Sequence, residues 1–185
     1  MIADVNIYSI KVPNMDGTIT DLSAYKEKVL LVVNTATGCG FTPQYEALEK
    51  IYREYKEKGL RILDFPCDQF GSQAHDTISE IHSFCTARYD ISFDQFAKID
   101  VNGKNEIELY TYLKKKQGFH GFGDSLDANY MRKKLAKEVP GYEETTDIKW
   151  NFTKFLINRQ GEVIARFEPT EDMDLVEAAV KEAME

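Results

Sequence analysis

The feature that most constrains the fold of this chain is an apolar segment, residues 28–33, followed by a short turn that holds Cys39. The valine and leucine content of this segment is typical of a β-strand that is covered on both faces of a sheet. Thr42 and Pro43 then fit the N-cap and the first position of a helix, which Gly59 would end. A strand that passes through a tight turn into a helix predicts an α/β fold.

Cys39 is predicted to be chemically reactive because of this position. Backbone N–H groups and the dipole at a helix N-terminus stabilise the thiolate, which is the nucleophilic form of cysteine. Gly38 and Gly40 flank the sulfur with little bulk, so a small substrate could approach it. The alternative is a free cysteine that only packs in a loop, and these residues by themselves leave both interpretations open.

The remaining pattern alternates strands with helices. Two short strands at residues 7–11 and 18–22 are expected to form an N-terminal hairpin, with an Asp-Gly pair in the turn. Further strands are expected at residues 60–65, 96–99, 154–157 and 163–167, and further helices at residues 77–89, 106–116, 125–139 and 172–184. This order predicts a central mixed sheet flanked by helices. With a cysteine at the start of the first helix it favours a thioredoxin-like fold, although the chain lacks a Cys-x-x-Cys pair.

The length and composition of the chain predict a single globular domain and argue against several classes of partner. With 185 residues, of which 43% are hydrophobic, the chain is expected to form a single domain, residues 1–185. A net charge of −8 argues against nucleic acid and against an anionic membrane surface as partners. No segment approaches the roughly 20 apolar residues of a membrane-spanning helix. Residues 1–6 do not match a secretory signal, and 3 cysteines do not make a disulfide scaffold, so we expect a cytoplasmic protein.

The sequence predicts neither a metal site nor an organic cofactor. His75, His82 and His120 are scattered, without paired spacing or an acidic cluster beside them. The glycine-rich run at residues 118–123 does not follow a strand, as a dinucleotide-binding turn would. A copper-binding protein of thioredoxin-like fold would need a second cysteine and a histidine near Cys39 in the sequence, and the chain has neither there.

Three segments together resemble the signatures of the glutathione peroxidase family in its cysteine-containing form. Residues 34–42, Asn-Thr-Ala-Thr-Gly-Cys-Gly-Phe-Thr, resemble the catalytic-cysteine segment of that family. Residues 60–73 resemble its second signature, and residues 150–156 resemble its third. The resemblance covers most of the chain. It implies a thioredoxin-like thiol peroxidase that reduces hydrogen peroxide and organic or lipid hydroperoxides.

The resemblance also implies roles for four residues. Cys39 would be the peroxidatic cysteine, and Gln73, Trp150 and Asn151 would complete the catalytic set. Their amide and indole N–H groups can donate hydrogen bonds to the charged sulfur or to the departing oxygen. Peroxide would convert the thiolate into a sulfenic acid. Without the motif, Trp150 would be interpreted as a core aromatic residue and the two amides as ordinary polar groups.

A second cysteine, Cys85, lies on the helix predicted at residues 77–89. By its spacing it shares an apolar face of that helix, which by itself predicts a small buried side chain. The resemblance implies instead a resolving cysteine that forms a disulfide with Cys39. Because a disulfide needs Cα atoms within about 7 Å, part of the helix would have to unwind. A protein disulfide favours thioredoxin as the reductant, whereas glutathione would suit an enzyme without a resolving cysteine.

Two positions depart from the family pattern. Asp68 stands where the family commonly has asparagine, and a carboxylate near the sulfur would raise the pKa of the thiol. Residues 74–76, Ala-His-Asp, replace an expected acidic residue and proline. Cys67 follows a strand-ending proline and is expected to be a packing thiol.

Two further questions stay open at this point. A redox sensor that relays oxidation to a partner protein would use the same cysteine pair as a scavenging peroxidase. The helix predicted at residues 125–139 is amphipathic, and it could cover the core or form the interface of a homo-oligomer.

Overall fold

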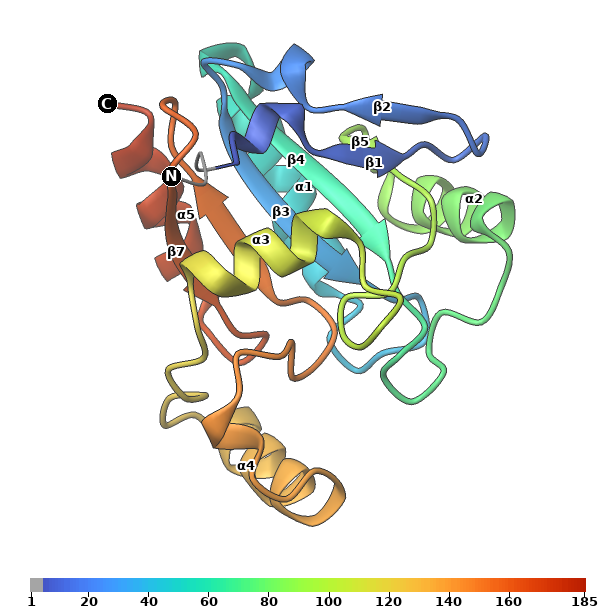
Figure 1. Ribbon diagram of the computed structural model, residues 1–185, viewed down its shortest axis with the longest axis vertical. Coiled ribbons are helices and arrows are strands. Elements are labelled where there is room, and N and C mark those ends of the chain that lie inside the picture. The colour runs from blue at the N-terminus through green and yellow to red at the C-terminus, as the bar shows by residue number, and fades with distance from the viewer. Residues whose placement is uncertain (1–4) are drawn as a thin grey trace.

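The computed structural model describes residues 5–185, which build a five-stranded mixed sheet with helices on both faces (Figure 1). The strands are β3 (Val29–Thr35), β4 (Leu60–Pro66), β5 (Asp94–Gln95), β6 (Lys154–Ile157) and β7 (Val163–Phe167). They lie in the order β5-β4-β3-β6-β7. β3 pairs in parallel with β4 and antiparallel with β6, so the strand that leads to Cys39 is the central one.

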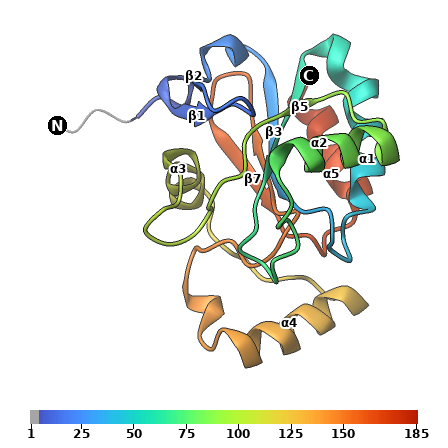
Figure 2. The same cartoon turned by 90° about the vertical axis from the view of Figure 1, so that its right-hand side faces the viewer.

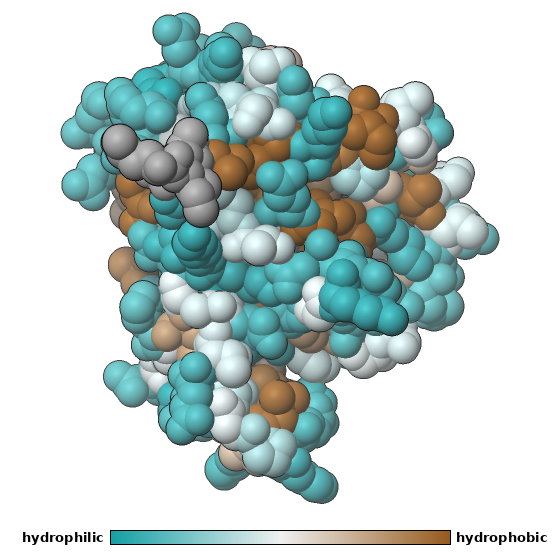
Figure 3. Space-filling view, viewed as in Figure 1, coloured by the Kyte–Doolittle hydropathy of each residue, from teal (hydrophilic) through white to brown (hydrophobic). Residues whose placement is uncertain are grey.

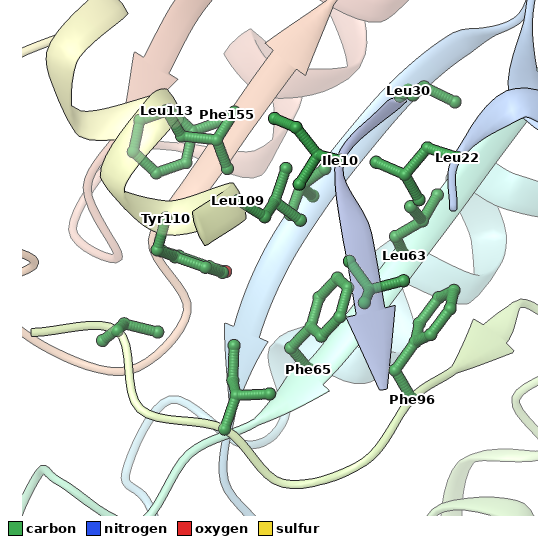
Figure 4. Packing of buried hydrophobic residues seen from close by; sticks show 14 of the residues in the cluster. Ile10, Leu22, Leu30, Leu63, Phe65, Phe96, Leu109, Tyr110, Leu113 and Phe155 are labelled. Carbon is green, nitrogen blue, oxygen red and sulfur yellow. The ribbon is translucent and has the colours of Figure 1, made fainter. Parts of the chain in front are cut away.

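The two faces of the sheet carry separate parts of the core, because alternate side chains of β3 point to opposite faces. Leu30 and Val32 pack towards the helix α3, Glu108–Lys116, as the close view in Figure 4 shows for this cluster. Leu31 and Val33 pack towards the other face. That face is covered by α1 (Gln44–Tyr55), α2 (Ile78–Tyr89) and α5 (Met173–Ala183). Figure 2 shows the two helical layers on either side of the sheet. All of β3 is buried, as predicted for a strand covered on both faces.

The predicted N-terminal hairpin is present as β1, Lys11–Pro13, and β2, Ile19–Asp21. Gly17 in its turn has a φ of +85°, a left-handed conformation that glycine adopts without strain. Residues Ile7–Ser9 form a 3-10 helix instead of the start of a strand. The side chain of Asn6 caps this helix by accepting a hydrogen bond from a backbone N–H two residues later. The hairpin contacts α3 on the same face of the sheet.

A further helix, α4 (Leu126–Glu138), lies beyond one end of the sheet, apart from the two helical layers (Figures 1 and 2). Its N-cap is Ser125, whose hydroxyl accepts a hydrogen bond from the first turn. Its buried side chains belong to a small cluster made of Phe122, Ala128, Met131, Leu135 and Tyr142. Phe41 and Trp150 pack against this cluster. α4 is therefore a local cover over that end of the core, one of the two roles predicted for residues 125–139.

Some element boundaries differ from the predicted ones. α1 has Pro43 rather than Thr42 as its N-cap, because the Thr42 hydroxyl is engaged inside the preceding turn. In place of the strand expected at residues 96–99, the sheet has the two-residue β5 just before it. The helix predicted from residue 77 is present as α2, and it begins with a capping box in which the side chains of Thr77 and Glu80 each accept a hydrogen bond from the backbone N–H of the other.

The surface is polar over much of the face that Figure 3 shows. The face shown in Figure 3 is largely hydrophilic, and its apolar residues form small separate patches. Across the described residues, no helix has the length and apolar character needed to cross a membrane.

Candidate active site

The turn between β3 and α1 places the Cys39 sulfur beside a backbone N–H group. Cys39 Sγ accepts a hydrogen bond from Phe41 N at 3.3 Å. Thr42 Oγ1 accepts one from Cys39 N at 3.0 Å and donates one to Ala36 O at 2.8 Å, so a single side chain closes the turn. Cys39 keeps 7% of its accessible surface. The sulfur lies in the turn that leads into α1, several residues before the first residue of that helix, Gln44.

The loop after β4 brings Gln73 to the Cys39 turn. Gly38 N donates a hydrogen bond to Gln73 O at 2.9 Å. A Cβ atom at Gly38 would meet that oxygen at 3.2 Å, so the close approach of the two backbones favours glycine. Gly71 and Ser72 have positive φ values of 66° and 52°, and this left-handed pair forms the bend that precedes Gln73.

Asp68, the departure from the family pattern, serves the same loop. Its Oδ1 atom accepts a hydrogen bond from Ala74 N at 3.0 Å, and the residue is half-buried. Aspartate side chains commonly close loops by bonding to nearby backbone N–H groups. The carboxylate is therefore engaged in holding the segment that carries Gln73, and its expected effect on the Cys39 thiol stays a prediction.

Trp150 and Asn151 lie in the segment just before β6. Asn151 is fully buried, and its Nδ2 atom donates to Gln73 Oε1 at 3.0 Å. Asn34 in β3 donates from Nδ2 to Trp150 O at 3.2 Å and accepts at its own backbone O from Phe152 N at 2.6 Å. Phe152 has a positive φ of 65°, which bends the chain at this point. Hydrogen bonds thus join Gln73 to Asn151 and hold Trp150 against the central strand.

The Trp150 ring lies between the Gln73 loop and α4. Its centroid is 5.7 Å from that of Phe70, and Lys134 Nζ lies 4.9 Å from it in a cation–π contact. Beside the ring is a cavity of about 340 Å³ between α4 and the loop. Its apolar lining comes from Phe70, Leu135, Val139, Ile148 and Trp150. This cavity gives room for a ligand next to a predicted site residue.

Cys85 lies in the middle of α2 and is fully buried. Gln95 Nε2 donates to its sulfur at 3.7 Å, and burial raises the pKa of the Cys85 thiol to about 11. Burial also raises the pKa of the Cys67 thiol to about 11, in keeping with a packing role. All three cysteines are free thiols, so Cys39 and Cys85 are not joined in this state.

Sequence reasoning missed Asn34 as a residue that holds the site. The signal was present, since Asn34 is a polar residue inside an otherwise apolar strand. The Oδ1 atoms of Asn34 and Asn151 are both buried without a hydrogen-bond partner among residues 5–185. Over the same residues, no group of three histidine, cysteine, aspartate or glutamate side chains could hold a metal ion.

Comparisons with known proteins show to which family this chain belongs. The family model described as glutathione peroxidase matches residues 7–114. A glutathione peroxidase homolog from Neisseria meningitidis is 46% identical over 177 residues, which cover 96% of this chain and 98% of the relative. The crystal structure of T. cruzi GPX1 has 32% sequence identity and a TM-score of 0.69, and the match covers 97% of each chain.

The likeness in fold extends to more distant proteins. A thiol:disulfide interchange protein of the thioredoxin family from Chlorobium tepidum matches with a TM-score of 0.59 at 12% identity. That match covers 98% of this chain and 97% of the other, and it confirms the predicted thioredoxin-like fold. Because the family model spans more than half of the 185 residues and the Neisseria relative matches nearly the whole chain, this chain belongs to the glutathione peroxidase family.

Proposed function

We propose that this chain reduces hydroperoxides through Cys39. The observation that carries the proposal is a pair of hydrogen bonds centred on Gln73. Gly38 N to Gln73 O ties the cysteine turn to the Gln73 loop, and Asn151 Nδ2 to Gln73 Oε1 ties that loop to the segment before β6. Three segments far apart in the sequence therefore meet at Gln73, next to the turn that holds Cys39. The proposed substrates are hydrogen peroxide and organic or lipid hydroperoxides.

In the proposed first step the Cys39 thiolate attacks the terminal oxygen of the hydroperoxide. An S–O bond forms and the O–O bond breaks, which leaves a sulfenic acid on the sulfur. The departing hydroxide or alkoxide takes up a proton from solvent and leaves as water or an alcohol. Phe41 N–H, which points to the sulfur at 3.3 Å, would stabilise the thiolate before the attack.

Gln73 and Trp150 would supply N–H donors for the departing oxygen. Because Gln73 Oε1 accepts from Asn151, the Gln73 amide is oriented so that its NH₂ group is the available donor. The indole of Trp150 can only donate. Donors that are fixed before the reaction stabilise the negative charge that develops on the departing oxygen. Since Asn151 Nδ2 is engaged by Gln73, Asn151 would act by orienting Gln73.

The cavity beside Trp150 supports organic hydroperoxides as substrates. Its volume of about 340 Å³ and the apolar part of its lining suit the hydrocarbon part of such a molecule. The charged side chains of Lys134, Glu138, Asp147 and Lys149 also line the cavity. Hydrogen peroxide needs no such space. Comparison of the two substrate classes would therefore report on α4, which forms one side of the cavity.

We further propose that Cys85 resolves the oxidised Cys39. The Cys85 sulfur would displace the hydroxyl of the sulfenic acid, so that an S–S bond forms and the hydroxyl leaves as water with the thiol proton. Because Cys85 is buried within α2, part of that helix would have to unwind first. A protein disulfide favours a dithiol reductant, and thioredoxin is the proposed one. Glutathione is the second candidate, and a redox sensor would use the same two cysteines.

The location and organisation of the chain are also proposals. We propose one domain over residues 1–185, because β6 and β7 complete the sheet and lie outside the matched residues 7–114. A cytoplasmic location is proposed from the cysteine content, because 3 cysteines do not make a disulfide scaffold. The expectation drawn from residues 1–6 falls partly on residues 1–4, which lie outside the described part of the chain. A homo-oligomer stays a prediction.

The catalytic proposal is tested by Cys39→Ser, with Cys67→Ser as the matched control. Peroxide consumption would be followed at steady state with thioredoxin and, separately, with glutathione as the donor. We expect Cys39→Ser to lose roughly a thousandfold or more in rate, as removal of a nucleophile does. Cys67→Ser is expected to keep its activity. Peroxide consumption by a folded Cys39→Ser protein at the unsubstituted rate would contradict the proposal.

A further inference from the structure

A buried polar cluster lies beside Cys85, outside the catalytic site. Its centre is Asp64 in β4, which is fully buried. Three donors satisfy this carboxylate: Thr35 Oγ1 at 2.5 Å, Tyr45 OH at 2.9 Å and Gln95 Nε2 at 2.8 Å. A buried carboxylate is costly unless it is hydrogen-bonded in this way. The proposed peroxidase chemistry does not use any of these side chains.

The carboxylate determines how the Gln95 side chain is oriented. An ionised carboxylate only accepts hydrogen bonds, so the NH₂ group of Gln95 must face Asp64. The same Nε2 atom lies 3.7 Å from Cys85 Sγ. The Oε1 atom of Gln95 therefore faces the other way, where it lies 2.8 Å from His82 Nδ1. Because this oxygen can only accept, His82 Nδ1 is the donor of that bond.

Gln95 thus contacts two residues of α2 from the edge strand β5. His82 and Cys85 are three positions apart, so they lie on one face of the helix. Ile81 and Cys85 are the buried residues of α2, and Ile78 and Tyr89 pack against the same part of the core. The two contacts with Gln95 add polar interactions to this apolar packing, at the position of Cys85 itself.

Cys85 cannot attack the oxidised Cys39 while it stays buried within α2. Its sulfur has no accessible surface, and burial raises the pKa of its thiol to about 11. A buried and protonated thiol is a poor nucleophile. To attack Cys39, the Cys85 side chain must leave Gln95, and His82 leaves with it if this part of the helix unwinds. Gln95 can then keep its bond to Asp64, so the buried carboxylate is not left without that donor.

We propose that Gln95, held by Asp64, is the positioning residue that retains Cys85 in its reduced site, and that breaking the Gln95 contacts with Cys85 and His82 releases Cys85. This inference rests on the proposed role of Cys85 as the resolving cysteine. The released thiol then displaces the hydroxyl of the Cys39 sulfenic acid, with water as the leaving product. The oxidant is the hydroperoxide that formed the sulfenic acid.

The retention of Cys85 can be measured without any peroxidase turnover. In a Cys39→Ser, Cys67→Ser background Cys85 is the single thiol, and its labelling by N-ethylmaleimide reports opening of α2. Gln95→Met removes the contacts with both Cys85 and His82, and His82→Ala removes one of them while the bond between Gln95 and Asp64 remains. Ser83→Ala, on the exposed side of α2, is the matched control.

We expect both contact variants to label faster, on the order of tenfold for the loss of one or two net hydrogen bonds. Ser83→Ala should label at the unsubstituted rate. Urea unfolding of each variant separates local opening from global loss of stability. Equal labelling rates in all variants would overturn the proposal, as would an acceleration that merely follows the fall in global stability.

A second measurement distinguishes this proposal from the resolving role on which it rests. After one equivalent of hydrogen peroxide, the protein with all three cysteines should form the Cys39–Cys85 disulfide faster when it carries His82→Ala. A merely structural role for this contact would not speed that step. If labelling is faster but no such disulfide forms in any variant, Gln95 retains Cys85 and the resolving role is wrong.

Discussion

The surroundings of Cys39 and of Cys85 differ in almost every respect that governs thiol chemistry. Cys39 lies in a turn at the start of α1, keeps 7% of its surface and has a backbone N–H directed at its sulfur. Cys85 lies inside α2, has no accessible surface, and burial raises the pKa of its thiol to about 11. Cys39 is therefore placed where a peroxide can reach it, whereas Cys85 must first be released.

This difference implies that the two steps of the proposed cycle are controlled by different parts of the fold. The hydrogen bonds that meet at Gln73 would govern oxidation of Cys39. The contacts of Gln95 with α2 would govern how often Cys85 becomes available. A variant near Gln73 should therefore change the rate of Cys39 oxidation and leave the release of Cys85 unchanged, and a variant at Gln95 should do the reverse.

Removal of Cys85 is expected to have the largest effect, because it should abolish the second step of the cycle and leave the first. We expect Cys85→Ser to undergo the first oxidation at the usual rate but to lose turnover supported by thioredoxin. Its Cys39 should then accumulate as sulfenic acid and over-oxidise to sulfinic acid, because no thiol of the same chain traps it. Stopped-flow oxidation and coupled turnover would be compared with Cys67→Ser as the control. Normal turnover with thioredoxin in Cys85→Ser would remove Cys85 from the mechanism.

The pH dependence of the unfolding free energy tests the buried cluster around Asp64, which lies beside Cys85. Burial raises the pKa of Asp64 from 3.8 to about 6 in the folded protein. Between these values the folded state binds the proton more strongly than the unfolded state does, so the contribution of Asp64 to stability falls as the pH rises. Relative to Asp64→Asn, the unsubstituted protein should lose roughly 2 kcal/mol of unfolding free energy between pH 4 and pH 7.

Urea unfolding at a series of pH values checks this expectation. Asp64→Asn is expected to be less stable overall, since an amide cannot accept from all three donors at this site. The informative quantity is the pH dependence of the difference between the two proteins. A difference that stays constant from pH 4 to pH 7 would show that burial does not raise the pKa of Asp64.

Gln73→Ala tests whether Gln73 assists the oxidation of Cys39. The matched control is Gln160→Ala, which lies in an exposed turn. Loss of a donor to the departing oxygen should lower the rate of Cys39 oxidation by roughly a hundredfold. Labelling of Cys85 should stay unchanged, because Gln73 belongs to the other region. An equal effect of both substitutions on oxidation would argue against a role for Gln73.

Much of the fold was predictable because its signals are local. The strand before Cys39 is an uninterrupted apolar run, and the capping box of α2 lies within four residues, Thr77 to Glu80. β5 was not predicted at Asp94–Gln95, because two residues become a strand only through pairing with β4. From the sequence, the Thr42 hydroxyl could cap the helix or bond within the preceding turn. In the structure it bonds within the turn, a choice that depends on how the turn folds.

The site was predictable as a set of residues and not as a set of contacts. Cys39, Gln73, Trp150 and Asn151 lie in segments that resemble the family signatures. The bond from Asn34 to Trp150 spans 116 positions, and no local pattern encodes it. The cluster around Asp64 is similar, since Gln95 is 31 positions away and looks like a surface residue in the sequence.

In the proposed cycle the hydroperoxide oxidises Cys39 first, and Cys85 then resolves the sulfenic acid. The most direct test is to treat the reduced protein with one equivalent of hydrogen peroxide and to map its thiols by mass spectrometry within seconds. We expect a Cys39–Cys85 disulfide with Cys67 still free. A lasting sulfenic acid on Cys39 beside a free Cys85, or a Cys39 that does not react, would contradict it.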